Sequence, residues 1–196
     1  MIAITESKLL NARLHDAVRH AKLGAAARLV RGATDVPDAL ARLIEGGCLA
    51  EAARVTAYAL PHREAVWWVC MCADHTAPAH LSHADKRSRE LAEEWVRIPD
   101  EDTRYKAMEW AQRAGMRSAE AWAAVAAFFS GPSLSQRGME AVTPPPHLTG
   151  RIVSDAITVA ALRGDAARKD LRLAYFLGSA NEISVGEAGR LEPEQE

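Results

Sequence analysis

An uninterrupted run of nine apolar residues covers positions 65–73, which read AVWWVCMCA and include two adjacent tryptophans. A helix on the surface of a protein keeps one polar face, and this run has none. At nine residues it is too short to span a bilayer, which takes about 20. The pattern therefore predicts a helix that is buried on most sides, at the centre of a helical domain.

Elsewhere, apolar residues recur at intervals of three and four, which is the spacing of one helix face. No alternating pattern typical of a β-strand is longer than four residues. We therefore predict an all-α fold, either a compact helical bundle or an array of helical hairpins, with about eight helices. Besides the tryptophan-rich helix, the expected helices cover residues 6–22, 36–45, 49–59, 82–98, 102–114, 118–129, 148–162 and 165–177.

Capping residues support several of these helices. Asp35, Ser82 and Ser118 each stand directly before a predicted helix, where a side-chain oxygen can accept a hydrogen bond from the first turn. Pro61 cannot continue a helix but is well tolerated in a first turn, so it should end one helix and open the tryptophan-rich one. These signals predict that two helices meet at a sharp corner there.

Two segments depart from the helical pattern. Residues 131–147 contain glycines, serines and three consecutive prolines, which predict a proline-rich loop that crosses the helices. Residues 187–196 are rich in glutamate and poor in apolar residues, which predicts an acidic disordered tail. The remaining residues, 1–186, are predicted to form a single helical domain.

Composition narrows the classes of partner. Hydrophobic residues make up 48% of the chain, charged residues 26%, and the formal net charge is -2. This balance is ordinary for a globular protein and gives no reason to expect nucleic acid or an anionic membrane as a partner. There are three cysteines, an odd number, and the chain begins without a basic region followed by an apolar segment. We therefore expect a reduced, cytoplasmic protein.

One cluster could hold a metal ion. Thiolates and imidazoles bind zinc, and the candidate ligands lie close in sequence: Cys70, Cys72, His75, His80 and His83. Two residues apart on a helix, however, the two thiols point about 200° away from each other. The cysteines are more simply explained as small apolar residues of a packed helix. A metal-dependent enzyme that uses this region stays an alternative, but we expect no metal or other cofactor.

The sequence contains no catalytic pattern that stands on its own. His62 or Glu64, at the start of the tryptophan-rich helix, could act as a general base in a cleft. We favour the interpretation that Glu64 interacts with the start of its own helix and that Arg63 pairs with a neighbouring acid. There is no Gly-x-Ser-x-Gly motif and no glycine-rich phosphate loop. We therefore predict no catalytic residue and no enzyme activity.

Tryptophan is unusually frequent, and aromatic residues dominate protein interfaces. Helical spacing places Trp67, Trp95 and Trp122 in the predicted core. Trp110 lies opposite Met108 on its helix and is harder to bury. The predicted interaction residues are Trp110, Pro144, Pro145 and Pro146.

Three segments carry a resemblance: residues 59–70 (ALPHREAVWWVC), 121–131 (AWAAVAAFFSG) and 144–149 (PPPHLT). With them the chain resembles an uncharacterised bacterial family whose members are encoded near type VI secretion genes, among spike, PAAR-tip and effector components. The resemblance covers about residues 45–165. The family brings no established catalytic residues, so the resemblance implies a genomic neighbourhood and an accessory role.

These observations favour a non-enzymatic helical adaptor, or a chaperone-like protein, that acts in the cytoplasm on a type VI secretion effector or spike component. An immunity protein that blocks a secreted toxin is a further alternative. The expected partner is a protein, and neither nucleic acid nor membrane is expected to bind.

Overall fold

The computed structural model describes residues 7–135 and 138–194, with only the backbone of residues 10 and 11. Over this part of the chain there are nine α-helices and no β-strand, which confirms the predicted all-α class and compact helical arrangement. The helices are α1 (Leu14–Ala21), α2 (Val36–Glu45), α3 (Leu49–Ala59), α4 (His62–His75), α5 (His83–Arg97), α6 (Glu101–Arg113), α7 (Ala119–Phe129), α8 (Leu148–Ala161) and α9 (Lys169–Ser184). Short 3₁₀ turns lie at Lys8–Asn11, Gly24–Arg28 and Ala166–Arg168.

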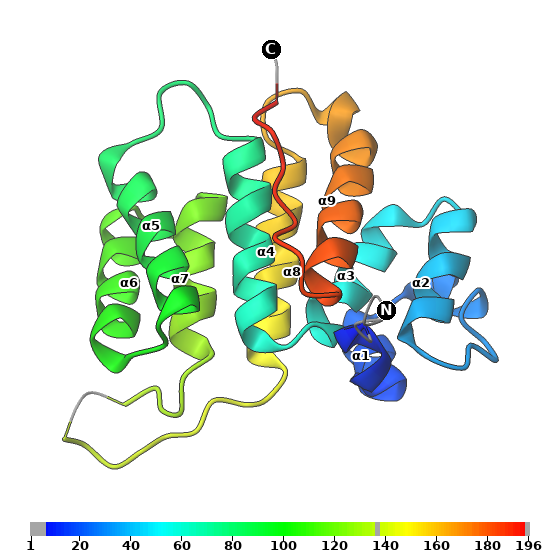
Figure 1. Ribbon diagram of the computed structural model, residues 1–196, viewed down its shortest axis with the longest axis horizontal. Coiled ribbons are helices and arrows are strands. Elements are labelled where there is room, and N and C mark those ends of the chain that lie inside the picture. Colours follow the sequence, from blue (N-terminus) through cyan, green and yellow to red (C-terminus); the bar gives the residue numbers. More distant parts are fainter. Residues whose placement is uncertain (1–6, 136–137, 195–196) are drawn as a thin grey trace, which may run out of the picture.

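Helices α4 and α8 occupy the middle of the molecule, and the other helices pack on two sides of them (Figure 1). Helices α5, α6 and α7 form a group on one side, where α7 contacts both α4 and α8. Helices α3 and α9 lie on the other side, and α3 also contacts α1 and α2. In the described part of the chain, no helix combines the length and the apolar character that a membrane span requires.

Helix α4 carries the apolar run through the core, as predicted. The Trp68 side chain is fully buried, and its indole N–H donates a hydrogen bond to the backbone oxygen of Phe176 in α9 at 2.7 Å. Trp67 is only half-buried, and its indole N–H faces the C-terminal segment. Of the other tryptophans expected in the core, Trp95 is buried and Trp122 is half-buried.

The predicted N-caps are confirmed. The side chains of Asp35, Ser82 and Ser118 accept hydrogen bonds from backbone N–H groups in the first turns of α2, α5 and α7. Such caps satisfy donors that the helix itself leaves unpaired, which is why the sequence signal located these helix starts well.

Small residues let the helices approach each other closely. The alanines of α7 are buried against the neighbouring helices. In α8, Gly150 faces the ring of Tyr58 in α3, and a Cβ atom at position 150 would lie 2.4 Å from Tyr58 Cδ1. A larger residue would push α3 and α8 apart, so this glycine sets their separation.

A buried ion pair joins three helices. Glu120, in the first turn of α7, is fully buried, and Arg163, which follows α8, donates to its two carboxylate oxygens at 2.9 and 2.6 Å. The same guanidinium donates to the backbone oxygens of Ala73 and Thr76 at 3.2 and 3.0 Å. These oxygens lie at the C-terminal end of α4, where a helix lacks partners of its own. Arg163 therefore connects the ends of α4, α7 and α8.

The prediction of one helix over residues 6–22 is wrong in its first half. The structure has a 3₁₀ turn at Lys8–Asn11, and α1 begins only at Leu14, because the two residues before it have extended backbone. The hydroxyl oxygen of Ser7 accepts a hydrogen bond from a backbone N–H two residues later, and such local bonds compete with a helix. Residue 6 lies outside the described residues.

The prediction of a disordered tail is wrong for residues 187–194, which follow an extended path across α4 and α9 (Figure 1, red). The indole of Trp67 donates a hydrogen bond to the Ala188 backbone oxygen at 2.7 Å. The hydroxyl of Ser179 donates to the Gly189 backbone oxygen at 2.5 Å. Gly189 has a φ of +58°, and a Cβ atom there would lie 2.6 Å from the Ser179 backbone oxygen. Glycine is therefore required for the tail to lie this close to α9.

Charge fixes the far end of the tail. The buried Arg172 of α9 donates from two nitrogens to the carboxylate of Glu194 at 3.0 and 2.7 Å. Its third nitrogen donates to the Ala161 backbone oxygen at 3.1 Å, and the Glu194 backbone N–H donates to the His75 oxygen at 2.7 Å. The acidic composition led to a wrong prediction of disorder, because composition alone does not reveal that a glutamate of the tail pairs with a buried arginine. Residues 195–196 lie outside the described residues.

Replacing Glu194 with glutamine is expected to lower the free energy of unfolding at neutral pH by about 1.5–3 kcal/mol, the range for a hydrogen bond to a charged group. The hydrogen bonds from Arg172 lower the pKa of Glu194 from its ordinary value of 4.5. A carboxyl with a lowered pKa stabilises the fold above the unfolded-state pKa and loses this contribution as the pH falls through the folded-state pKa. Urea unfolding at several pH values should therefore show the two proteins converging as the pH falls below 4.5. A difference that stays constant into strong acid would contradict this role of Glu194.

Candidate functional site

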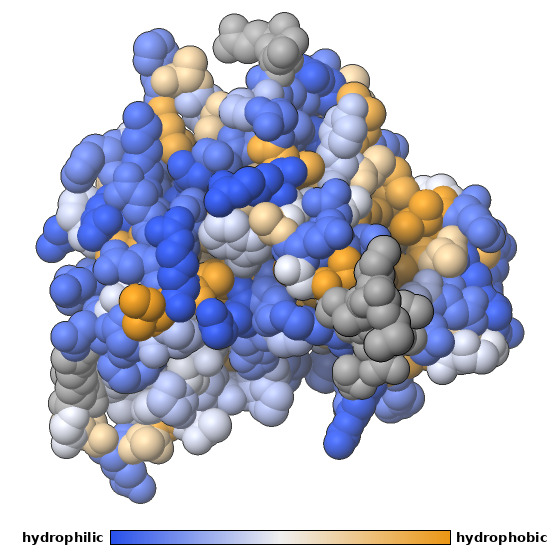
Figure 2. Space-filling model, in the orientation of Figure 1, coloured by the Kyte–Doolittle hydropathy of each residue, from blue (hydrophilic) through white to orange (hydrophobic). Residues whose placement is uncertain are grey.

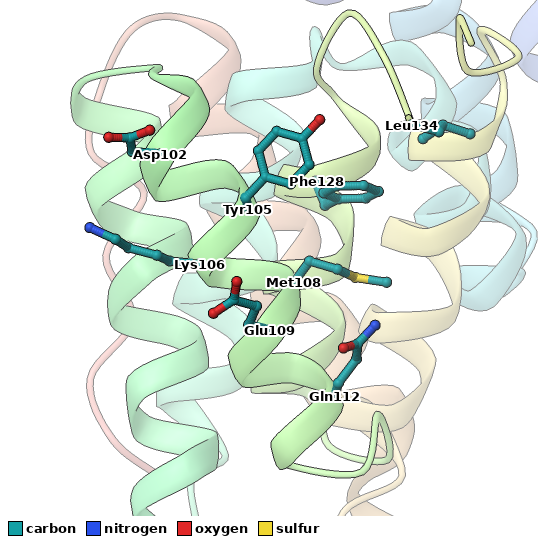
Figure 3. Close-up of a pocket in the computed structure, with 8 residues that line it drawn as sticks. All are labelled: Asp102, Tyr105, Lys106, Met108, Glu109, Gln112, Phe128 and Leu134. Carbon is teal, nitrogen blue, oxygen red and sulfur yellow. The ribbon is translucent and has the colours of Figure 1, made fainter. Parts of the chain in front are cut away.

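A cleft of about 770 Å³ that is open to solvent lies along α6. Tyr105, Met108 and Gln112 of α6 are three and four residues apart, so they lie along one side of the helix. Figure 3 shows this side turned toward Phe128 of α7 and Leu134 of the loop that follows α7. The cleft is lined by Asp102, Tyr105, Lys106, Met108, Glu109, Gln112, Phe128 and Leu134.

A buried arginine holds the aromatic wall of the cleft in place. The guanidinium of Arg104 donates to the Glu101 carboxylate at 2.7 and 2.6 Å and to the Phe128 backbone oxygen at 2.7 Å. It also lies 4.6 Å from the ring centroid of Tyr105 and 4.8 Å from that of Phe128, within the range of cation–π attraction. A Cβ atom at Gly131 would lie 2.4 Å from Arg104 Cδ, so a larger residue at position 131 would displace the arginine side chain.

The loop between α7 and α8 is tied to itself and to α6. The Leu134 backbone N–H donates to the Val142 backbone oxygen at 2.8 Å, and the Val142 N–H donates to the Ser133 hydroxyl at 3.1 Å. The hydroxyl of Tyr105 donates to the Ser135 backbone oxygen. These bonds fix Leu134 as one wall of the cleft. The returning arm of the loop carries Met139, whose side chain is 69% exposed.

The chemistry of the cleft suits binding. Its floor is aromatic and aliphatic, and its rim carries the carboxylates of Asp102 and Glu109, the ammonium of Lys106 and the amide of Gln112. An apolar side chain of a partner can fill the floor while polar groups around it meet the rim, which is the usual arrangement of an interface anchor. Among the described lining residues there is no serine, cysteine or histidine that could act as a nucleophile or base with the carboxylates.

The structure does not bring the predicted interaction residues together. Trp110 is half-buried and faces α5, where its ring meets the edge of His83 at 5.3 Å between centroids. It therefore lies on a different side of α6 from Tyr105 and Met108. At the other end of the loop, Pro146 lines a small cavity. Pro144 is half-buried, whereas Pro145 and Pro146 are exposed.

The candidate metal cluster is not assembled either. Cys70 and Cys72 are fully buried, and burial raises the pKa of both thiols, which disfavours the thiolate that a metal needs. His75 contacts the backbone oxygen of Glu192 in the tail, and His80 and His83 are exposed. Across residues 7–135 and 138–194, no three side chains of the metal-binding types converge on one point.

The start of α4 shows partners different from those expected. Glu64 accepts a hydrogen bond from Lys8, so its carboxylate serves an ion pair with the 3₁₀ turn at the start of the chain. Arg63 was expected to pair with an acid, and this was wrong. Its guanidinium donates to the Val96 backbone oxygen near the end of α5, at 2.9 Å from Nε. His62 is exposed at the first turn.

Sequence reasoning missed Tyr105 and Met108, although a signal was present. Helix α6 is fully buried on one side, at Ala107 and Ala111, and carries further apolar residues that are only half-buried on another side. The second side carries Tyr105 and Met108 at a spacing of three. A helix with more apolar sides than its buried face uses is a candidate for binding.

Comparison with known proteins assigns the chain to a family. A model of a family described as a family of unknown function, DUF6931, matches residues 39–184, which span most of α2 through to the end of α9. No curated protein and no solved structure matches the chain. The match agrees with the resemblance to an uncharacterised family and includes all residues that line the α6 cleft.

Proposed function

The chain belongs to the DUF6931 family of unknown function, and from that premise we propose that it is a non-enzymatic helical adaptor that holds a protein partner in the α6 cleft. The observation that carries this proposal is the cleft itself, with an aromatic and methionine floor inside a polar rim. Aromatic and methionine side chains are enriched in the central part of protein interfaces.

The rigidity of the cleft supports this function. Arg104 is fully buried and fixes both aromatic rings, which lie 5.6 Å apart at their centroids and nearly perpendicular to each other. A surface that is already in its binding geometry loses little conformational entropy when a partner binds. The exposed Met139 on the adjoining loop adds a flexible apolar contact that can adapt to different partners.

For the partner, we propose a type VI secretion effector or spike component that the protein holds in the cytoplasm before loading. The support for this identity is the resemblance of residues 59–70, 121–131 and 144–149 to proteins encoded beside such genes. A chaperone-like role fits a cleft that takes an apolar side chain, because an unassembled component exposes such side chains before it reaches its final site.

Replacing Met108 with glutamate is expected to reduce partner capture at least tenfold, because a charge would be buried in the floor of the cleft. Tagged protein expressed in the native host would be purified and its companions identified by mass spectrometry. As a matched control, Leu162→Glu changes an exposed apolar residue at the end of α8, away from the cleft, and should leave capture unchanged. The proposal fails if no secretion component accompanies the wild-type protein, or if the Met108 variant retains the same companions.

A further inference from the structure

A second apolar groove lies between α2, α3 and α9, on the opposite side of the molecule from the α6 cleft (Figure 1). Its volume is about 590 Å³. The α2 wall presents Pro37, Leu40 and Ile44, and the α9 wall presents Ala174, Gly178 and Asn181. Figure 2 shows apolar surface along α9 and toward α2, beside the C-terminal segment.

The two walls have the spacing of helix packing. Along each wall the lining residues are three or four positions apart, so each helix turns a whole stripe of two turns toward the groove. Packed helices bury such stripes against a third helix, because ridges of one helix fit the grooves between the side chains of its neighbours. The groove is thus an incomplete helix-packing site.

Gly178 indicates that something approaches α9 from outside. It lies within a 16-residue helix, where glycine costs about 1 kcal/mol relative to alanine. Within residues 7–135 and 138–194, no atom requires the glycine, since a Cβ atom at this position would meet nothing within 4 Å. Gly150 differs, because a Cβ atom there would clash with the ring of Tyr58. A missing side chain at Gly178 instead lets a partner backbone come close to α9.

Exposed apolar side chains extend the groove along α9. Leu171 and Tyr175 are 50% and 51% exposed, and they fall on the same side of the helix as Gly178, at spacings of seven and three. Helix α9 therefore has apolar residues on its buried face and again on its outer face. On this outer face the ring of Tyr175 meets that of His75 at 5.8 Å between centroids, and about half of the Leu171 and Tyr175 side chains stays exposed.

The charged residues beside the groove indicate the charge that a partner should carry. Glu45 follows Ile44 at the end of α2, and Glu182 follows Asn181 on α9, and both are exposed. The basic side chain nearest in sequence to Glu45, that of Arg42, is already bound by Asp38 at 2.8 Å. Lys8, which stands between the lining residues Ser7 and Leu9, is paired with Glu64. The exposed carboxylates of Glu45 and Glu182 therefore leave an acidic edge, which a basic partner complements.

We propose that this groove docks an amphipathic helix of a partner protein, with apolar anchors at i, i+3 or i+4, and i+7 and with lysine or arginine on its flanks. A helix in a groove between two other helices is a common mode of peptide recognition. This surface is independent of the α6 cleft, so the proposal does not depend on the partner that the cleft holds.

The test uses the full-length protein and a fluorescein-labelled helical peptide of leucine and lysine, with leucine repeated at spacings of three and four. Fluorescence anisotropy should give micromolar binding, and at least tenfold weaker binding for the same peptide with glutamate in place of lysine. Gly178→Leu should reduce binding of the lysine peptide at least tenfold without loss of stability, because leucine favours a helix and has open space there. Ile98→Glu, at a residue that is 71% exposed and lines neither the groove nor the α6 cleft, serves as the control and should bind the peptide as the wild type does.

The proposal is overturned if the lysine peptide does not bind, or if Gly178→Leu binds it as tightly as the wild type. Two other occupants have their own signatures. If removal of residues 1–6 tightens peptide binding more than tenfold, the groove belongs to the first residues of this chain. If light scattering finds a wild-type dimer that Gly178→Leu dissociates, the groove belongs to a second copy. Either result also overturns the proposal.

Discussion

Replacing Arg163 with methionine is expected to lower the free energy of unfolding by about 3–5 kcal/mol, the usual cost of removing one partner from a buried ion pair. The reason is the carboxylate of Glu120, which is fully buried and receives both of its side-chain hydrogen bonds from this guanidinium. Without Arg163 the carboxylate is left in a buried position without a partner that compensates for its lost hydration. Urea unfolding followed by circular dichroism measures the change.

Two further variants separate the ion pair from the other contacts of Arg163. Arg151→Met removes an exposed pair with Asp155, whose side chains are 57% and 41% exposed, and should cost less than about 1 kcal/mol. The double variant Glu120→Met, Arg163→Met removes both buried charges and should recover most of the loss. If the double variant is as unstable as the single one, the hydrogen bonds to the Ala73 and Thr76 oxygens carry the stability, and the ion pair does not.

Local signals in the sequence predicted much of the fold. The apolar run of α4 could be satisfied only by burial on most sides, and the caps at Asp35, Ser82 and Ser118 fixed three helix starts. These signals work because the partners lie within a few residues of each other. The same logic failed at residues 8–13, where local hydrogen bonds favour a 3₁₀ turn over a continuous helix.

Features that depend on distant partners were not predictable in this way. Glu120 and Arg163 are separated by 43 residues, and neither has a pattern that marks it as buried. The tail looked disordered because it is acidic, yet the partner of Glu194 is a buried arginine 22 residues earlier. The candidate site was missed for a related reason. Trp110 was favoured for its size, whereas the packing of α5 covers part of it and leaves Tyr105 and Met108 facing the cleft.

Replacing Trp68 with alanine is expected to lower the free energy of unfolding by about 3–5 kcal/mol, because the substitution leaves a cavity at the centre of the molecule. Trp68→Phe fills most of that space but cannot donate to the Phe176 backbone oxygen, 2.7 Å from the indole nitrogen. It should therefore cost about 1–3 kcal/mol, because one hydrogen bond is lost and the smaller ring leaves part of the indole volume empty, while the Phe176 oxygen, inside α9, keeps its helical partner. The same measurement of urea unfolding applies to both variants.

The neighbouring tryptophan provides the matched control. Trp67 makes a hydrogen bond of the same length, 2.7 Å, but to the Ala188 oxygen in the tail and at a half-exposed position. After Trp67→Phe, water can reach that oxygen, so the loss should be below about 1 kcal/mol. If the two phenylalanine variants lose equal stability, the tail encloses Trp67 as completely as the helices enclose Trp68. In that case residues 187–194 belong to the folding unit and are more than a cover added to it.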